Sequence, residues 1–158
     1  MTEPATRTAA VGGQRLTYLI KRLEMAERSR MEEVLRPLGM SLQQYTALSI
    51  LERRGGLSSA QLARRHYVTP QAMHQLVTMM ERDGLIERRI DGGNRRILRA
   101  WLTGQGEEAL LACHRAVDDV EGRMIAALGD DEASTFARAL ERCLAALVEP
   151  HGGRDGDA

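Results

Sequence analysis

The chain has 158 residues, of which 43% are hydrophobic and only 3% aromatic; this suits one domain or one module with an oligomerisation element and argues against an aromatic-lined cofactor pocket or a base-stacking single-strand binder. No apolar run reaches the roughly 18 residues of a membrane span, no signal peptide is apparent, and two cysteines suit the reducing cytoplasm. The net charge is zero, but it is unevenly placed: residues 53–99 carry 10 Arg and 4 acidic residues (net +6), and residues 100–149 carry 4 Arg and 10 acidic residues (net −6). This distribution predicts a basic surface that binds an anionic polymer and a separate acidic surface with a different role.

The N-terminal part of the chain predicts one helix after a disordered start. Residues 1–11, like residues 149–158, cannot bury a core and are expected to be disordered. Apolar residues recur at helical spacing from Gln14 to Leu35, and the segment Pro37-Leu38-Gly39 ends that pattern. We therefore expect an N-terminal dimerisation helix within residues 12–40.

The next three helices are marked by their capping residues. Ser41 and Gln44 have the spacing of a capping box, and Ser58 and Gln61 repeat it. Thr69 is the expected N-cap of the third helix, because Pro70 follows it at the first helical position. Glycines end the first helix at 55–56 and the third at 84.

Two extended segments and two helices follow. Residues 85–90 and 97–102 predict strands, joined by the turn signal Asp91-Gly92-Gly93-Asn94, and Leu98, Ala100 and Leu102 would form one apolar face of the second strand. Helices are expected at 107–128 and 131–147. Their apolar stripes are too long for so small a chain to cover, which predicts pairing with a second copy.

A short helix, a tight turn, a longer helix and a β-ribbon follow one another in the order of a winged helix-turn-helix, which places one helix where it can enter a DNA major groove. The predicted fold is mainly α, with a small β-wing. It comprises a DNA-binding domain at 41–106 and a dimerisation domain formed by the N-terminal helix and the C-terminal helices at 107–148.

The candidate DNA-contacting residues lie on the longer helix and around the ribbon. The outer face of that helix is neutral and polar, whereas a solvated face usually carries Lys and Glu, and its amide, hydroxyl and imidazole groups can bond base edges. Arginines around the glycine-rich turn suit a narrow minor groove. The predicted recognition-helix residues are Thr69, Gln71, Ala72, His74, Gln75 and Thr78. The predicted wing and backbone contacts are Ser58, Ser59, Arg64, Arg65, Arg88, Arg95 and Arg96.

These segments resemble the MarR family of winged-helix transcription regulators over roughly residues 14–148. The matching pieces are Leu62-Ala63, Val68-Thr69, residues 76–88 and Leu102-Thr103-Gly104-Gln105-Gly106. The resemblance implies an obligate homodimer, a palindromic double-stranded DNA operator and often a small aromatic or phenolic effector that weakens DNA binding. No effector-binding residue can be identified from the sequence.

The resemblance also assigns roles at the wing tip. The family carries Asp-X-Arg there, and the pattern falls on Asn94-Arg95-Arg96. Arg96 thus takes the position of the minor-groove arginine, while Asn94 replaces the acid that helps to hold the wing. Asp91 is the candidate substitute for that acid.

The cysteines and histidines predict neither a redox-sensing site nor a metal site. Cys113 and Cys143 lie on apolar helical stripes, which favours shielded packing over redox sensing, and the oxidant-sensing branch of the family carries its cysteine in the first helix, where residues 14–36 have none. The histidines lack metal-ligand spacing. We expect no enzyme, no metal and no cofactor.

The expected function is therefore a cytoplasmic, DNA-binding transcriptional regulator. It is expected to act by occupying an operator, as a repressor first, and the sequence alone does not decide between repression and activation. Three alternatives stay open. One is a dimeric winged-helix regulator of another family, such as the PadR-like group, without a small-molecule pocket. The second is a cysteine redox-responsive regulator. The third is an interaction module that kept the fold and lost DNA binding.

Overall fold

The computed structural model describes residues 10–11 and 13–148. Most of the ends expected to be disordered, residues 1–9 and 149–158, lie outside the described residues. Ala10–Val11 (β1) was expected to be unstructured but pairs with Gln14–Arg15 (β2) in a short antiparallel hairpin. The chain forms two compact units, residues 1–120 and 121–158, which are described separately.

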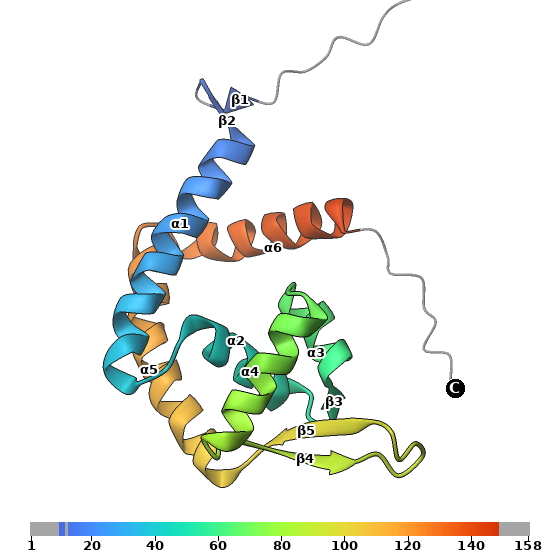
Figure 1. The fold of residues 1–158 in the computed structure, drawn as a ribbon. Helices are drawn as coiled ribbons and strands as arrows, with labels where there is room; N and C mark the ends of the chain where they lie inside the picture. The colour runs from blue at the N-terminus through green and yellow to red at the C-terminus, as the bar shows by residue number, and fades with distance from the viewer. Residues whose placement is uncertain (1–9, 12, 149–158) are drawn as a thin grey trace, which may run out of the picture. The chain divides into compact units, whose positions relative to one another are not determined.

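The first unit holds most of the helices and a small sheet (Figure 1). Its elements after the hairpin are α1 (Leu16–Leu35), η1 (Arg36–Leu38), α2 (Leu42–Arg53), β3 (Leu57–Ser58), α3 (Ser59–His66), α4 (Pro70–Arg82), β4 (Ile86–Ile90), β5 (Leu98–Leu102) and most of α5 (Gly104–Ala126). The predicted order of elements is confirmed, and β3 is an addition to it.

The helix starts follow the predicted capping chemistry. Gln44 N donates to Ser41 Oγ at 3.1 Å, and Ser41 N donates to Gln44 Oε1 at 2.9 Å. The same reciprocal pair opens α3 between Ser58 and Gln61. At α4, Ala72 N donates to the Thr69 hydroxyl at 3.2 Å. Each box satisfies backbone donors that a helix start otherwise leaves without partners.

The sheet has three antiparallel strands in the order β3-β5-β4. Ala100 on the central strand pairs with Leu57 on one side and with Arg88 on the other. Ala100 is buried, but Leu98 is exposed, because it lies toward the free end of the ribbon, beyond the core. The expected apolar face of β5 is therefore buried at Ala100 and exposed at Leu98.

The core of the first unit is formed by side chains from every long helix and from the sheet. Figure 1 shows α2, α3 and α4 packed next to the β4–β5 ribbon. On the inner side of α4, Met73, Val77 and Met80 are fully buried and Leu76 is half-buried. The other large side chains that are fully buried in this core are Leu35, Leu48, Leu62, Leu110 and Cys113.

The end of the ribbon is tied to the start of α5 through Thr103. Its hydroxyl donates to Gly84 O at 2.6 Å and accepts from Gly106 N at 3.0 Å. A β-carbon at Gly106 would lie 1.9 Å from Leu85 O, so only glycine fits there. This contact fixes the start of α5 on the turn between α4 and β4.

The second unit contains the end of α5 and α6 (Asp130–Leu147). Along α6, an exposed apolar stripe is formed by Leu140, Leu144 and Leu147. None of the described helices combines the length and the apolar character that a membrane span requires.

Candidate nucleic-acid interface

The outer face of α4 is exposed as predicted. Pro70 begins the helix behind the Thr69 cap, and the buried methionines and valine fix which side points out. The exposed residues are Thr69, Gln71, Ala72, His74, Gln75 and Thr78. Thr78 Oγ1 donates to His74 O at 2.9 Å, which leaves its oxygen able to accept a hydrogen bond. This face offers neutral donors and acceptors of the kind that bond base edges.

The predicted backbone contacts on α3 lie at its two ends. Ser58 caps the helix and Ser59 begins it, both half-buried. Arg64 and Arg65 are exposed in the last turn, and Arg65 Nη1 donates to Gln61 O at 3.4 Å. Both guanidinium groups therefore stand at the solvent surface just before the turn into α4.

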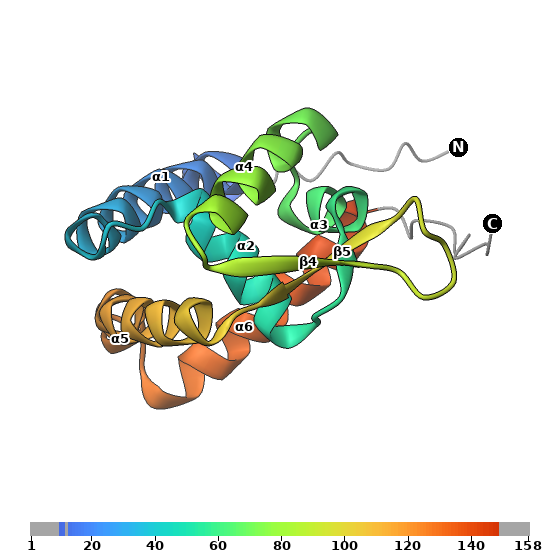
Figure 2. The same cartoon turned by 60° about the horizontal axis from the view of Figure 1, so that its bottom comes forward.

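The wing is held by an ion pair between Asp91 and Arg99. The sequence pointed to Asp91 as the acid but did not identify its partner. The turn at the free end of the β4–β5 ribbon projects away from α2, α3 and α4 (Figure 2). At its base, Arg99 Nε lies 3.0 Å from Asp91 Oδ1 and Nη2 lies 3.3 Å from Oδ2. This hydrogen bond lowers the pKa of Asp91, and the carboxylate in turn raises that of Arg99. Asp91 thus forms the acidic anchor that the family pattern places at Asn94.

Two further contacts stabilise the same turn. Arg99 Nη1 donates to Gly56 O at 2.9 Å, which connects the wing base to the loop before β3. Asn94 Oδ1 accepts from Arg96 N at 3.0 Å, so Asn94 orders the tip through its amide oxygen. The substitution of the family's acid leaves the wing anchored at both its base and its tip.

The arginines of the ribbon fall into two groups. Arg88, predicted to contact DNA, is half-buried and pairs with Glu81 of α4, donating from Nε at 2.9 Å. This hydrogen bond lowers the pKa of Glu81. Arg89 pairs with Glu87 and lies over the Trp101 ring, 5.4 Å from its centroid. These contacts hold the ribbon to itself and to α4. Sequence reasoning missed them because they depend on the register of the ribbon.

The two arginines at the wing tip form the second group. Arg95 and Arg96 are exposed, and no ion pair within the described residues involves either guanidinium. Both are therefore positioned to insert into a minor groove.

The Asp91→Asn substitution is expected to loosen the wing without unfolding the chain. It removes the charge that holds Arg99 while leaving the core untouched, so amide hydrogen exchange at residues 92–97 should accelerate with little change in thermal midpoint. The control is Asp83→Asn, which removes an exposed ion pair with Arg82 away from the wing. Equal protection of the wing amides in Asp91→Asn and wild type would contradict this role.

The pH dependence of the anchor has a definite sign. The folded-state pKa of Asp91 is lowered. The stabilisation that the ionised Asp91 gives the wing is therefore complete at neutral pH and is lost as pH falls through that lowered pKa. Wing exchange rates corrected for intrinsic chemistry should therefore stay constant between about pH 6 and 8.

A polar chain of three residues joins α2 to α5 behind this surface. The Tyr45 hydroxyl and His114 Nδ1 lie 3.1 Å apart, and His114 Nε2 lies 3.0 Å from Glu52 Oε2. The Tyr45 and His114 rings meet edge to face. This chain ties the helix expected to dimerise to the first helix of the predicted DNA-binding domain.

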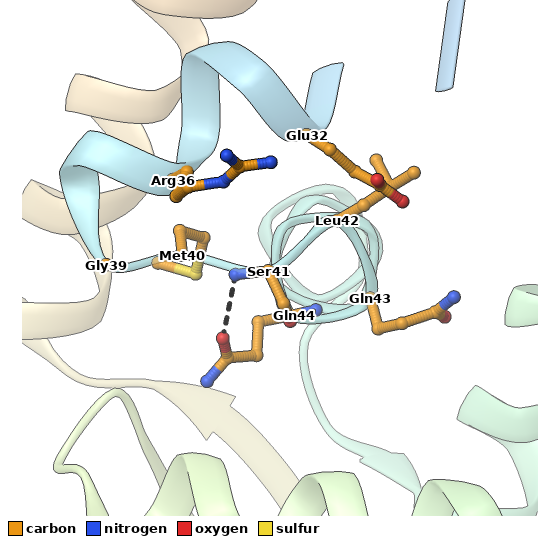
Figure 3. A pocket seen from close by; sticks show the side chains of 8 residues that line it. All are labelled: Glu32, Arg36, Gly39, Met40, Ser41, Leu42, Gln43 and Gln44. Carbon is orange, nitrogen blue, oxygen red and sulfur yellow. Dashed lines mark hydrogen bonds between the residues drawn. The ribbon is translucent and has the colours of Figure 1, made fainter. Parts of the chain in front are cut away.

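An open groove of about 500 Å³ lies between the end of α1 and the start of α2. Figure 3 shows Arg36 and Glu32 on the α1 side, facing the Ser41–Gln44 capping box of α2. Arg36 and Glu32 are both exposed. The remaining lining residues are Gly39, Met40, Leu42 and Gln43.

The two cysteines differ in their surroundings. Cys113 is buried, and burial raises the pKa of its thiol, as the apolar stripe predicted. The expectation of shielding is wrong for Cys143, which is exposed in the single chain because nothing in the second unit covers that face of α6. Within the described residues, no cluster of three His, Cys, Asp or Glu side chains could hold a metal ion.

The model of the MarR family matches residues 38–97, from the end of η1 to the wing. The transcriptional repressor Rv2887 of Mycobacterium tuberculosis is 34% identical over 127 residues, which cover 80% of this chain and 91% of the repressor. The transcriptional regulator HosA of Escherichia coli is 24% identical over 101 residues, covering 64% of this chain and 75% of HosA.

Solved structures agree with these relationships. The Rv2887 complex with DNA matches with a TM-score of 0.71 at 32% identity, covering 82% of this chain and 98% of that one. The Rv2887 complex with salicylic acid matches with a TM-score of 0.68 at 33% identity, covering 82% and 96%. MarR from Escherichia coli, at 22% identity and a TM-score of 0.73 over 83% and 98% of the two chains, shares the fold. The chain belongs to the MarR family of winged-helix transcriptional regulators.

Proposed function

We propose that the chain is a repressor that binds a palindromic operator as a homodimer and leaves it when a small aromatic acid binds. In each subunit, α4 enters the major groove and the wing tip enters the neighbouring minor groove. The observation that carries the proposal is the exposed polar face of α4, in a stretch from Arg53 to Met80 that contains no acidic residue. Rv2887, a relative at 32% identity, has been solved in complex with DNA, which supports DNA binding by this chain.

Each part of the surface has a separate role in this proposal. Gln71, His74 and Gln75 contact base edges from the middle of the exposed face, with Thr78 further along it. The capping and arginine residues of α3, with Thr69, contact phosphates, which positions α4 without specifying sequence. Ala72 offers only its methyl group, which suits an apolar contact with a thymine methyl. Arg95 and Arg96 insert into the minor groove, and Arg88 supports the ribbon through Glu81.

The experiment that tests DNA reading starts from a duplex selected by the full chain from a randomised pool. The selected sequences should share an inverted repeat. Substituting Gln71, His74 or Gln75 with alanine should weaken binding to the selected duplex by about 1–3 kcal/mol and affect a scrambled duplex much less. The control is Gln105→Ala, which removes an exposed amide from α5 instead.

Two outcomes would contradict the proposal at different levels. Equal losses on the selected and scrambled duplexes would mean that α4 does not read bases. Failure of the wild type to bind any duplex at low salt would exclude the regulator and leave the interaction module.

We propose that the effector binds in the groove between α1 and α2. A volume of about 500 Å³ accommodates a single-ring acid, and the Arg36 guanidinium suits its carboxylate. The groove lies where α1 ends and the DNA-binding domain begins, so an occupant that prefers one arrangement of these helices shifts the population toward it. Rv2887 has been solved with salicylic acid and with p-aminosalicylic acid, which supports this ligand class.

Salicylic acid is expected to raise the thermal midpoint of the wild type and to weaken its DNA binding, with a coupling of about 1–3 kcal/mol. Arg36→Ala should bind DNA normally and lose both responses. Arg30→Ala, which removes an exposed arginine that pairs with Glu33 on the same helix, should keep them. An Arg36→Ala protein that responds like the wild type would remove the groove from the mechanism, and an unresponsive wild type would favour a regulator without a small-molecule pocket.

A further inference from the structure

The turn between α3 and α4 carries a strained residue. Tyr67 follows α3 with φ 59° and ψ 37°, and it is the only non-glycine residue with a positive φ in the described part of the chain. A residue with a β-carbon is disfavoured in this left-handed region, and glycine or asparagine usually occupies it at the end of a helix. Tyrosine has no local hydrogen bond of the asparagine kind with which to offset this strain.

Packing of the ring does not offset the strain either. The Tyr67 side chain is 80% exposed. The backbone of the turn is nevertheless held firmly, because the N–H groups of Tyr67 and Val68 both donate to Ala63 O. On the other side of Tyr67, His66 Nε2 donates to Gln43 O at 2.9 Å. The fold therefore presents the ring to solvent from a fixed backbone position.

The surroundings of Tyr67 indicate what the ring meets. Exposed Arg64 and Arg65 precede it in the last turn of α3, and the exposed Thr69 cap of α4 follows two residues later. A phenol hydroxyl within a basic surface suits a phosphate oxygen, and tyrosine is among the residues that donate to DNA phosphates. Tyr67 precedes the helix that enters the groove, so the sugar-phosphate backbone is the part of the duplex nearest to it.

We propose that the Tyr67 hydroxyl donates a hydrogen bond to a backbone phosphate at the edge of the major groove and thereby sets the depth and register of α4. This inference rests on the proposed DNA binding and adds to it a positioning residue that lies outside the recognition helix and the wing. It also accounts for a tyrosine at a position that glycine or asparagine would fill without strain, since neither has a side chain that reaches as far.

Two substitutions separate this role from a structural one. Tyr67→Phe keeps the ring and the strained backbone and removes only the hydroxyl, so affinity for the selected duplex should fall about tenfold, as for loss of a hydrogen bond to a charged group. Tyr67→Asn relieves the strain and shortens the side chain, so it should raise the thermal midpoint while weakening DNA binding at least as much. The control is Tyr18→Phe, which removes the hydroxyl of another exposed tyrosine, on α1, and should change neither quantity.

The phosphate itself can be found with single methylphosphonate substitutions along the selected duplex. One position in each half-site should weaken wild-type binding and leave Tyr67→Phe unaffected, because that protein has already lost the contact. The salt dependence of affinity should be unchanged in Tyr67→Phe and reduced in Arg64→Ala, because only the arginine carries a charge that displaces counterions.

Each remaining outcome overturns a defined claim. Wild-type affinity in Tyr67→Phe together with a weakened Tyr67→Asn would show that the ring, and not the hydroxyl, makes the contact. Wild-type affinity in both variants would remove Tyr67 from the interface while leaving the proposed function intact. A wild type that binds no duplex would overturn the proposed function and this inference with it.

Discussion

Replacing Leu144 with glutamate is expected to convert the homodimer to a monomer and to lower operator affinity by about 10²–10⁴-fold, the range in which linking two binding sites raises avidity. Leu144 is 59% exposed in the single chain and belongs to the stripe with Leu140 and Leu147. A contiguous apolar stripe in contact with water marks an interaction surface, and a two-fold axis would bury the stripes of two copies together. A carboxylate in that interface would lose its hydration without gaining a partner.

The matched control is Ala145→Glu. It adds the same charge one residue further along α6, about 100° around the helix from Leu144, where the exposed Ala145 lies outside the stripe. Sedimentation should give a monomer for Leu144→Glu and a dimer for Ala145→Glu and the wild type. A dimeric Leu144→Glu protein, or a monomeric wild type at micromolar concentration, would place the interface elsewhere or exclude it.

The helix starts were predictable because their chemistry is local. Ser41 and Gln44 lie three residues apart, and the hydrogen bonds between them need no information from the rest of the fold. The same holds for Thr69 and Pro70, which set the start of α4 and therefore which of its residues point outward. The exposed face of α4 followed from these signals and from helical periodicity alone.

The wing was only partly predictable because its contacts cross the ribbon. Five arginines surround the turn, and their residue type does not separate Arg88, engaged by Glu81, from the exposed Arg96. That distinction depends on the ribbon register and on how β4 packs against α4. The two-residue strand β3 was missed for a similar reason, since a segment so short has no periodicity and forms only by pairing with β5.

The exposure of Cys143 shows a different limit. Its apolar stripe predicts burial, and the single chain provides nothing to bury it. The stripe was identified correctly, but the surface that covers it belongs to a second copy in the proposed dimer. The sequence pattern indicates that a face is apolar without indicating which molecule packs on it.

The position of α4 relative to α5 is fixed by several contacts within the first unit. Thr103 and Gly106 join the start of α5 to the turn after α4. Further along, His114 on α5 is linked to Tyr45 and to Glu52 on α2. A helix tied at two points to the DNA-binding domain transmits its own displacement to α4. These contacts hold the first part of α5 and α4 together within each subunit, and we expect the ligand-free dimer to present its two recognition helices at one spacing.

That rigidity predicts a strong dependence on operator spacing. Two recognition helices of a dimer occupy successive major grooves when the half-site centres are about 10 base pairs, or roughly 34 Å, apart. Inserting about five base pairs between them rotates one half-site to the opposite face of the duplex. Tight binding should be lost, with affinity falling to that of a single half-site. Inserting about ten base pairs returns the second half-site to the same face of the duplex but leaves it too far from the first, so this insertion should recover little of the affinity.

The comparison between the two insertions decides how the subunits cooperate. Affinity should be measured by gel shift and by footprinting, since a footprint reports whether one half-site or both are occupied. Loss of protection at one half-site in both inserted duplexes is the result expected of a dimer whose α5 helices hold α4 firmly. Recovery with the longer insertion would mean that the connection between subunits stretches along the DNA while keeping its face. Full affinity for both inserted duplexes would show that each subunit reads DNA independently, in which case the Leu144→Glu monomer should also bind like the wild type.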